Sequence, residues 1–198
     1  MPLQSHKRTL ILASTSPYRK LLLQRLQLPF EVYAPNIDES AVAGEQPLEL
    51  VKRLALEKSR SAARQFPTAM VIGSDQIAVC EGEIVGKPGT VGNACKQLAS
   101  FSGQCVVFHS AFAICCEEND FLFEQMVDTE VCFRQLTRPE IQRYVELDNP
   151  IDCAGSFKSE AAGVSLLDSM TSSDPTAIIG LPLITLSRAL RQAGFDLP

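Results

Sequence analysis

Short apolar runs alternate with stripes of apolar residues along the first half of the chain. The runs predict strands over residues 9–13 and 30–33, and apolar positions spaced by three or four predict helices over 17–26 and 47–66. Ser16-Pro17 is typical of a helix start, with a side-chain cap followed by proline. A longer run over 69–79 predicts another strand, interrupted by the polar residues that follow Gly73.

The second half of the chain predicts a hairpin and further helices. Two apolar segments over 106–116 and 121–133 flank the polar sequence Glu-Glu-Asn-Asp, which indicates two strands joined by a turn. The remaining predicted elements are helices over 91–101, 137–146 and 176–193, and an extended segment over 153–167. This order predicts an α/β fold in which helices flank a mixed, twisted sheet.

Composition indicates one globular domain over residues 1–198. The chain is 45% apolar and 21% charged, which excludes global disorder. No apolar run approaches the length of about 18 residues that spans a membrane, and no signal peptide is visible, so we expect a cytoplasmic protein. The seven cysteines form no C-x-x-C pair, and we expect them to be free thiols in a reducing compartment.

Charge narrows the range of partners. The net charge of −5 disfavours a long nucleic acid. Residues 1–64 nevertheless carry ten basic and six acidic side chains, so this part of the chain could hold a small anion. The alternative is that these bases only decorate helix surfaces.

The first candidate site follows the first predicted strand. Ser14 and Ser16 precede a helix start, and Arg19 lies in its first turn. Free backbone N–H groups and the positive end of the helix dipole suit a phosphate at such a place. An ordinary serine cap followed by surface bases is the alternative.

Two charged residues lie where apolar ones are expected. Lys58 falls on the apolar stripe of the predicted helix 47–66, which favours a side chain that points into a cleft, although a snorkelling lysine would also fit. Asp75 interrupts an apolar strand, which metal binding or general-base work would explain; the alternative is a turn aspartate that bonds its own backbone.

A third polar cluster lies near residue 158. If this segment is extended, Ser156, Lys158 and Glu160 project from one face, because side chains alternate along a strand. Lys87 lies in a predicted turn. Cations and hydroxyls suit a polyphosphate, and carboxylates suit Mg²⁺, so the residues point to a metal-dependent enzyme that acts on a phosphorylated small molecule. A Ser–Lys hydrolase using Ser156 and Lys158 is a weaker alternative.

Taken in order, these segments resemble the Maf family of nucleotide pyrophosphatases from about residue 9 to residue 190. The resemblance is carried by Ser14-Thr15-Ser16-Pro17-Tyr18-Arg19, Asp38-Glu39, Lys58, Gly73-Ser74-Asp75, Gly86-Lys87-Pro88, Gly155-Ser156-Phe157 and Gly180-Leu181-Pro182. It implies two lobes around a central cleft, as in inosine-triphosphatase-like folds, and a possible homodimer.

The resemblance also implies roles for single residues. Asp75 would be the general base that activates water for attack on the α-phosphorus of a nucleoside triphosphate. A divalent cation, Mg²⁺ or Mn²⁺, would be held with help from Glu39 and Asp75. The side chains that would hold the triphosphate are Ser14, Arg19, Lys58 and Lys87.

Three departures from the common signature indicate one branch of the family. Tyr18, Gln76 and Glu160 make the chain similar to the bacterial 7-methyl-GTP pyrophosphatases. A cationic methylated guanine would stack on Tyr18, and Glu160 would accept from its N–H groups. Tyr18 could instead simply pack at the helix start.

Two other functions stay open at this point. The enzyme could act on pyrimidine or other modified triphosphates. The cleft could also belong to a nucleotide sensor that acts through a protein partner in septum formation, with the acidic stretch 117–130 as the partner surface.

Overall fold

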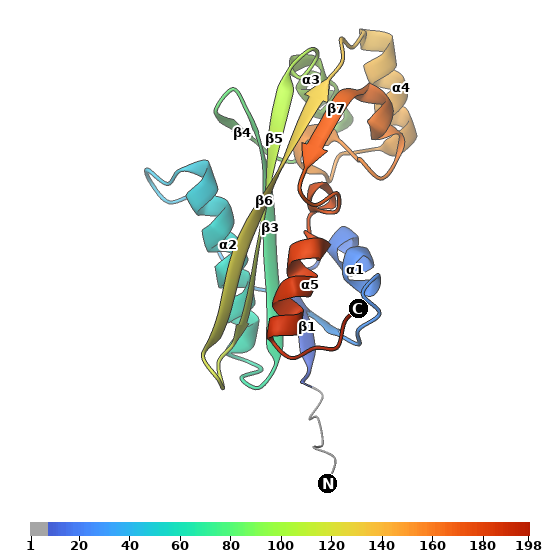
Figure 1. Cartoon of the computed structure of the whole chain (residues 1–198). Coiled ribbons are helices and arrows are strands. Elements are labelled where there is room, and N and C mark those ends of the chain that lie inside the picture. The colour runs from blue at the N-terminus through green and yellow to red at the C-terminus, as the bar shows by residue number, and fades with distance from the viewer. Residues whose placement is uncertain (1–7) are drawn as a thin grey trace.

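A computed structural model describes residues 8–198, so the N-terminal segment on which a signal peptide was sought lies largely outside it. Its strands form one sheet, which is mixed as predicted and has seven strands in the order β2-β1-β3-β5-β6-β7 with β4 paired to β3 (Figure 1). The strands are β1 (Leu10–Ala13), β2 (Glu31–Tyr33), β3 (Met70–Cys80), β4 (Glu83–Val85), β5 (Cys105–Cys116), β6 (Phe121–Phe133) and β7 (Leu167–Ser172).

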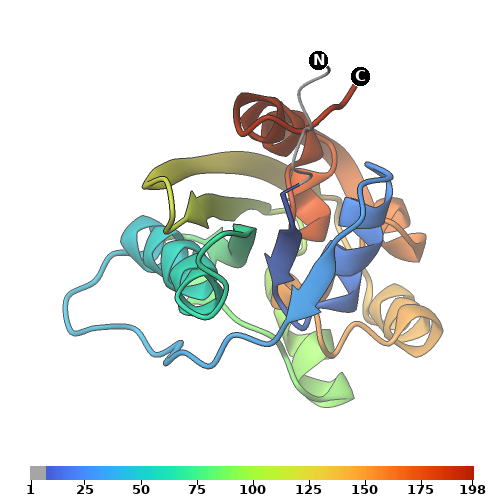
Figure 2. The ribbon, with the colours of Figure 1, turned by 90° about the horizontal axis from the view of Figure 1, so that it is seen from below.

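Five α-helices surround this sheet. They are α1 (Pro17–Gln24), α2 (Pro47–Ala63), α3 (Val91–Ser100), α4 (Arg138–Asp148) and α5 (Leu183–Gln192). α2 covers one face against β3 and β5, whereas α1 and α5 lie on the other side (Figures 1 and 2). Within residues 8–198 no helix is both long and apolar enough to cross a bilayer.

Two apolar clusters pack against the same face of β3. One cluster joins α1 and α5 to Met70 and Ile72, and the other joins α3 and α4 to Ala78. Ser74 and Gln76 lie on this face between the clusters, because side chains alternate along the strand. The polar residues of β3 therefore mark the division between the two lobes that the resemblance implied.

The strands beside β3 leave its polar middle uncovered along one edge. β1 pairs in parallel with β3 only as far as Ala13 opposite Gly73, and β4 pairs with it only from Ala78 onward. Residues 74–77 of β3 thus face a gap between two neighbouring strands. This gap opens at the carboxyl end of β1, where α1 begins.

Several predictions of local structure are wrong. β3 runs without interruption through Asp75, so this residue is not in a turn. Residues 153–167 are not extended, because 3₁₀ turns occupy Ala154–Ser156 and Ala162–Leu166. Helix α5 begins only at Leu183, after a separate 3₁₀ turn over Ala177–Ile179. Strands β4 and β7 were not predicted.

The expectation that all cysteines are free thiols is also wrong for one pair. Cys105 and Cys132 face each other in the antiparallel register of β5 and β6 and form a disulfide. Their Cα atoms are 4.0 Å apart, a neighbour relation that the linear sequence does not reveal. The free cysteines of the described chain are Cys80, Cys95, Cys115, Cys116 and Cys153.

Candidate active site

A cleft of about 490 Å³ opens beside the uncovered stretch of β3. Its volume falls in the range of small-molecule sites, about 300–1,000 Å³. The structure brings most of the site residues predicted from the sequence, though not Ser156 or Lys158, to the lining of this one cleft: Ser14, Tyr18, Arg19, Glu39, Lys58, Asp75, Gln76, Lys87 and Glu160. They come from segments up to 146 positions apart in the sequence, between Ser14 and Glu160.

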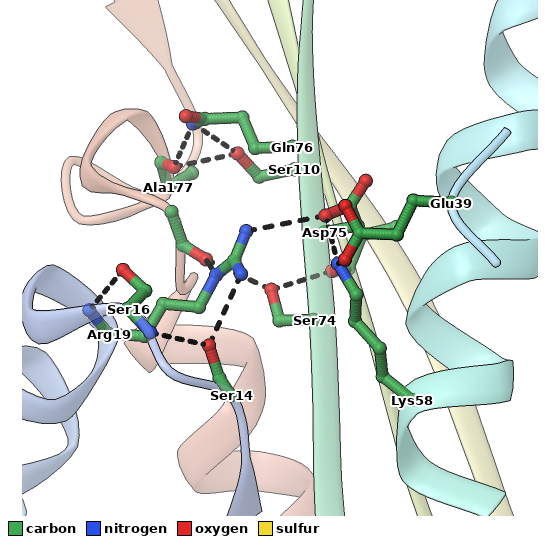
Figure 3. A network of polar contacts seen from close by, with 12 residues as sticks. Ser14, Ser16, Arg19, Glu39, Lys58, Ser74, Asp75, Gln76, Ser110 and Ala177 are labelled. Atoms are coloured by element: carbon green, nitrogen blue, oxygen red, sulfur yellow. Dashed lines mark hydrogen bonds and ion pairs between the residues drawn. The ribbon is translucent and has the colours of Figure 1, made fainter. Parts of the chain in front are cut away.

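Lys58 joins α2 to the carboxylates of the cleft. Its Nζ atom lies 2.7 Å from Asp75 Oδ1 and 2.9 Å from Glu39 Oε1 (Figure 3). The residue is only 5% exposed, and these two carboxylates compensate the cost of burying it. The cleft orientation is therefore confirmed over a snorkelling side chain. Burial raises the pKa of Glu39, but the hydrogen bond and charge of Lys58 outweigh that effect and lower it.

Arg19 approaches Asp75 from α1, which lies on the other side of the sheet from α2 (Figure 1). Its NH2 atom lies 3.7 Å from Asp75 Oδ1, and its Nε donates to the Gly180 carbonyl at 3.0 Å (Figure 3). Its NH1 donates to Ser14 Oγ at 3.4 Å. Burial lowers the pKa of Arg19, against the opposing charges of Asp75 and Glu39. One carboxylate oxygen of Asp75 thus receives two cations from two different helices.

The start of α1 is built as the sequence predicts. Ser16 is the N-cap, and its hydroxyl accepts from the backbone N–H of Arg19 at 3.4 Å, with Pro17 following the cap. The Ser14 hydroxyl accepts from the backbone N–H of Ser16 at 3.2 Å. The N-terminus of α1 therefore faces the cleft together with Thr15 and Arg19, which is a suitable place for an anion.

The amide of Gln76 is held in one orientation. Its Nε2 donates to Ser110 Oγ at 2.8 Å and to the carbonyls of Ala177 and Ile178 at 3.0 and 2.9 Å (Figure 3). The Ser110 hydroxyl donates in turn to the Ala177 carbonyl at 2.7 Å. With the amide nitrogen committed to protein acceptors, the side chain offers only its Oε1 to a molecule in the cleft, as a hydrogen-bond acceptor.

Tyr18 belongs to a network that the sequence did not reveal. Its hydroxyl donates to Asp152 Oδ2 at 3.1 Å and accepts from Cys153 Sγ at 3.6 Å. The ammonium of Lys158 lies 5.9 Å from the centroid of its ring. Burial, followed by the contacts with Cys153 and Asp152, raises the pKa of Tyr18, so the phenol stays protonated as a donor.

The segment around Ser156 departs from its predicted arrangement. Ser156 is fully buried and donates to Gln97 Oε1, whereas Lys158 Nζ donates to the Asp148 carbonyl at the end of α4. Glu160 alone of the three lines the cleft. The predicted common face does not form, and Ser156 and Lys158 do not make the pair that a Ser–Lys hydrolase needs.

Sequence reasoning missed Asp152 and Cys153 as lining residues and Ser110 as a partner of Gln76. One feature of the sequence could have indicated Asp152: it is a carboxylate three positions before the Gly155-Ser156-Phe157 motif. Ser110 carried none, because a serine within an apolar strand is common and only the sheet register places it beside Gln76.

The fold and the cleft together define an α/β protein that presents cations, serine hydroxyls, a helix N-terminus and paired carboxylates to a small anionic ligand. The fold resembles the structure of the Staphylococcus aureus Ham1 protein, with a TM-score of 0.50 at 15% identity over 95% of this chain and 100% of that one. The chain belongs to the Maf family, because the family model described as Maf-like protein matches residues 9–193.

Individual relatives cover nearly the whole chain. The 7-methyl-GTP pyrophosphatase of Aromatoleum aromaticum is 52% identical over 189 residues, which are 96% of this chain and 97% of that protein. The protein of the same name from Xanthomonas axonopodis is 51% identical, over 96% of this chain and 98% of its own length. The one from Idiomarina loihiensis is 49% identical, over 94% and 96%.

Proposed function

We propose that the protein is a nucleoside triphosphate pyrophosphatase that hydrolyses 7-methyl-GTP to 7-methyl-GMP and pyrophosphate. Full-length relatives at about half identity carry this activity in their names. The observation that carries the chemistry is the position of Asp75, which lies in the cleft between Arg19 and Lys58. A nucleotide substrate also supports the predicted cytoplasmic location.

The cationic side chains of the cleft hold the triphosphate in this proposal. Arg19 and Lys58 already lie within 4 Å of Asp75, and Lys87 lines the same cleft. Ser14 adds a hydroxyl beside the N-terminus of α1. Such groups bind the charged tail and neutralise the charge that develops on the leaving pyrophosphate.

The carboxylates of Glu39 and Asp75 fit a divalent cation. Lys58 is hydrogen-bonded to one oxygen of each, which leaves Asp75 Oδ2 and Glu39 Oε2 for another partner. Mg²⁺ in phosphate-processing sites uses one or two carboxylates and completes its coordination with phosphate oxygens and water. When bound, Mg²⁺ or Mn²⁺ would supply charge neutralisation at the phosphates. No group of three metal-ligating side chains occurs within residues 8–198.

Asp75 is the proposed base. The hydrolytic step forms a bond between a water oxygen and the α-phosphorus, and it breaks the bond from that phosphorus to the bridging oxygen of the β-phosphate. The departing oxygen keeps the electron pair and leaves with pyrophosphate, while Asp75 holds the proton lost by the water. Lys58 and Arg19 fix this carboxylate in place, so most of the rate would come from positioning and electrostatics.

Tyr18, Gln76 and Glu160 are the proposed readers of the base. Gln76 Oε1 and the Glu160 carboxylate are acceptors, which match the N–H donors on the edge of a guanine. The Tyr18 ring is available to a methylated guanine as an aromatic surface, although Lys158 already lies near it. This end of the cleft thus favours a base that is rich in donors.

The test is pyrophosphate release from a panel of triphosphates, with and without Mg²⁺ or Mn²⁺. We expect metal-dependent release led by 7-methyl-GTP, and at least about 1,000-fold slower turnover in an Asp75→Asn protein that keeps its fold. Near-wild-type turnover of Asp75→Asn would overturn the assigned base. Release led by UTP, CTP or dTTP would overturn the substrate, and tight binding without release would indicate a sensor.

Glu160→Ala is the matched test of base reading. Its carboxylate lines the cleft without an ion pair to Arg19, Lys58 or Lys87 among the residues described by the structure. We expect a larger loss of kcat/KM for 7-methyl-GTP than for UTP. Equal losses on both nucleotides would count against a role in base specificity.

A further inference from the structure

Asp152 presents a carboxylate at the wall of the cleft beside the proposed base readers. Its Oδ2 accepts from the Tyr18 hydroxyl at 3.1 Å, and its Oδ1 accepts from Cys153 Sγ at 3.5 Å. The side chain is 55% exposed and lines the cleft. A carboxylate has room for about four hydrogen bonds, so these contacts leave capacity for a ligand.

The charges around Asp152 leave this wall negative. Lys158 Nζ lies 3.9 Å from Asp152 Oδ1, but it makes its shorter hydrogen bond, 2.9 Å, to the Asp148 carbonyl. Glu160 lines the same cleft as a second carboxylate, and no ion pair to it occurs among the described residues. Burial raises the pKa of the neighbouring Cys153 thiol to about 11, so the thiol adds no charge near neutral pH.

The ring of Tyr18 is held between these groups. Asp152 accepts from its hydroxyl, and the Lys158 ammonium lies 5.9 Å from the ring centroid. The hydroxyl bond fixes the direction of the ring, and a carboxylate at its end adds negative potential beside the aromatic surface. A cation that stacks on Tyr18 would therefore meet both the ring and the carboxylate.

We propose that Asp152 is a specificity-determining residue, whose carboxylate at the Tyr18 hydroxyl favours a positively charged base over a neutral one. The inference rests on the proposed function, because 7-methyl-GTP differs from GTP by a methyl group that places a positive charge on the guanine ring. The neutral base gains nothing from this charge. A partly exposed carboxylate should contribute about two- to fivefold to the preference, the range of a screened ion pair.

The decisive variant is Asp152→Asn, which removes the charge and keeps an oxygen that accepts from Tyr18. Its matched control is Asp168→Asn, which neutralises an exposed carboxylate on β7 outside the cleft. A third variant, Tyr18→Phe, removes the hydroxyl bond and keeps the charge of Asp152. For each protein we would measure kcat/KM for 7-methyl-GTP and GTP, and Kd for 7-methyl-GMP and GMP at low and high salt.

We expect Asp152→Asn to lower the preference for the methylated nucleotide by about two- to fivefold in both measurements, mainly through weaker binding of the cationic base. The effect should shrink at high salt, because the charge is partly exposed. Asp168→Asn should leave both ratios unchanged. Tyr18→Phe should reduce affinity without reproducing the salt-dependent change in preference.

Two results would overturn the inference: an unchanged preference ratio in Asp152→Asn, with or without equal losses on both nucleotides, or the same salt-dependent change in Tyr18→Phe. The last would show that Asp152 acts only by orienting the ring. Absence of pyrophosphate release from 7-methyl-GTP by the wild type would overturn the proposed function alone. The Kd ratio would then still decide the inference, and a wild type that binds 7-methyl-GMP no better than GMP would refute it.

Discussion

Replacement of Gly73 by alanine tests how the lysine of α2 reaches the carboxylate of β3. A Cβ atom at Gly73 would be 2.9 Å from the Ser59 Cβ and nearer still to the Ala55 carbonyl oxygen and the Ser59 amide nitrogen. Ordinary contact begins at 3.4 Å. Because two of these neighbours are backbone atoms of α2, no rotamer change relieves the clash, and the helix itself has to move.

The size of the effect follows from this displacement. Restoring contact at Gly73 requires α2 to retreat by about 1 Å, at a cost of about 1–3 kcal/mol in unfolding free energy. The same retreat carries Lys58 away from Asp75, where the two atoms are now 2.7 Å apart. Misplacement of a catalytic group by about 1 Å can cost about 100-fold in rate, so we expect a loss of that order in kcat/KM.

Denaturant unfolding and pyrophosphate release would be measured on Gly73→Ala beside a matched control. Gly92 lies in α3 with open space where a Cβ would stand, so Gly92→Ala should keep full activity and gain about 0.5–1 kcal/mol. Adding Ser59→Gly should not rescue Gly73→Ala, since the backbone contacts remain. Wild-type stability and turnover in Gly73→Ala would refute the close approach of α2 to β3.

Three further variants test other parts of the structure. Lys58→Met should lower the unfolding free energy by about 2 kcal/mol and turnover at least about 100-fold, because it leaves Glu39 without its ion pair and Asp75 with Arg19 alone. Lys52→Met, on the exposed side of α2, should change neither in the same assays. The capping bonds of Glu140 at the start of α4 lower its pKa to about 2. Glu140→Gln should therefore be less stable than the wild type at neutral pH. In an acid titration of unfolding, this difference in stability should disappear as the pH falls from about 4.5 toward 2. Cys105 and Cys132 are 27 positions apart, so reduction of their disulfide should lower the unfolding free energy by about 3–4 kcal/mol on the chain-entropy model. An unchanged unfolding midpoint under reducing conditions would contradict this prediction.

The outline of the fold could be predicted because local patterns dominate its elements. The caps at Ser16 and Thr137 and the apolar stripe of α2 lie where the sequence places them. Prediction failed over residues 153–167 because the chain there turns around buried glycines. Gly155 has a φ of 67°, and Gly163 has no room for a Cβ beside the Lys158 carbonyl. The turn at Gly155 packs against Phe108 and Ala78, which are distant in sequence.

The members of the cleft were predictable for a different reason. Lys58 and Asp75 stand out because charged side chains on apolar stripes or in strands are costly unless a partner or a ligand compensates them. Their mutual contact, at 2.7 Å, was not predictable from either segment alone, because it depends on how closely α2 packs against β3.

The sequence by itself determined the order of the elements and which polar residues depart from their local pattern, since both follow from periodicity and the cost of burying charge. Only the tertiary structure decided the direction of the Gln76 amide, the disulfide between β5 and β6, and the place of Asp152 beside Tyr18. Each of these depends on sheet register or on the meeting of loops from two lobes. Such contacts join residues through space, and no local preference of the chain encodes them.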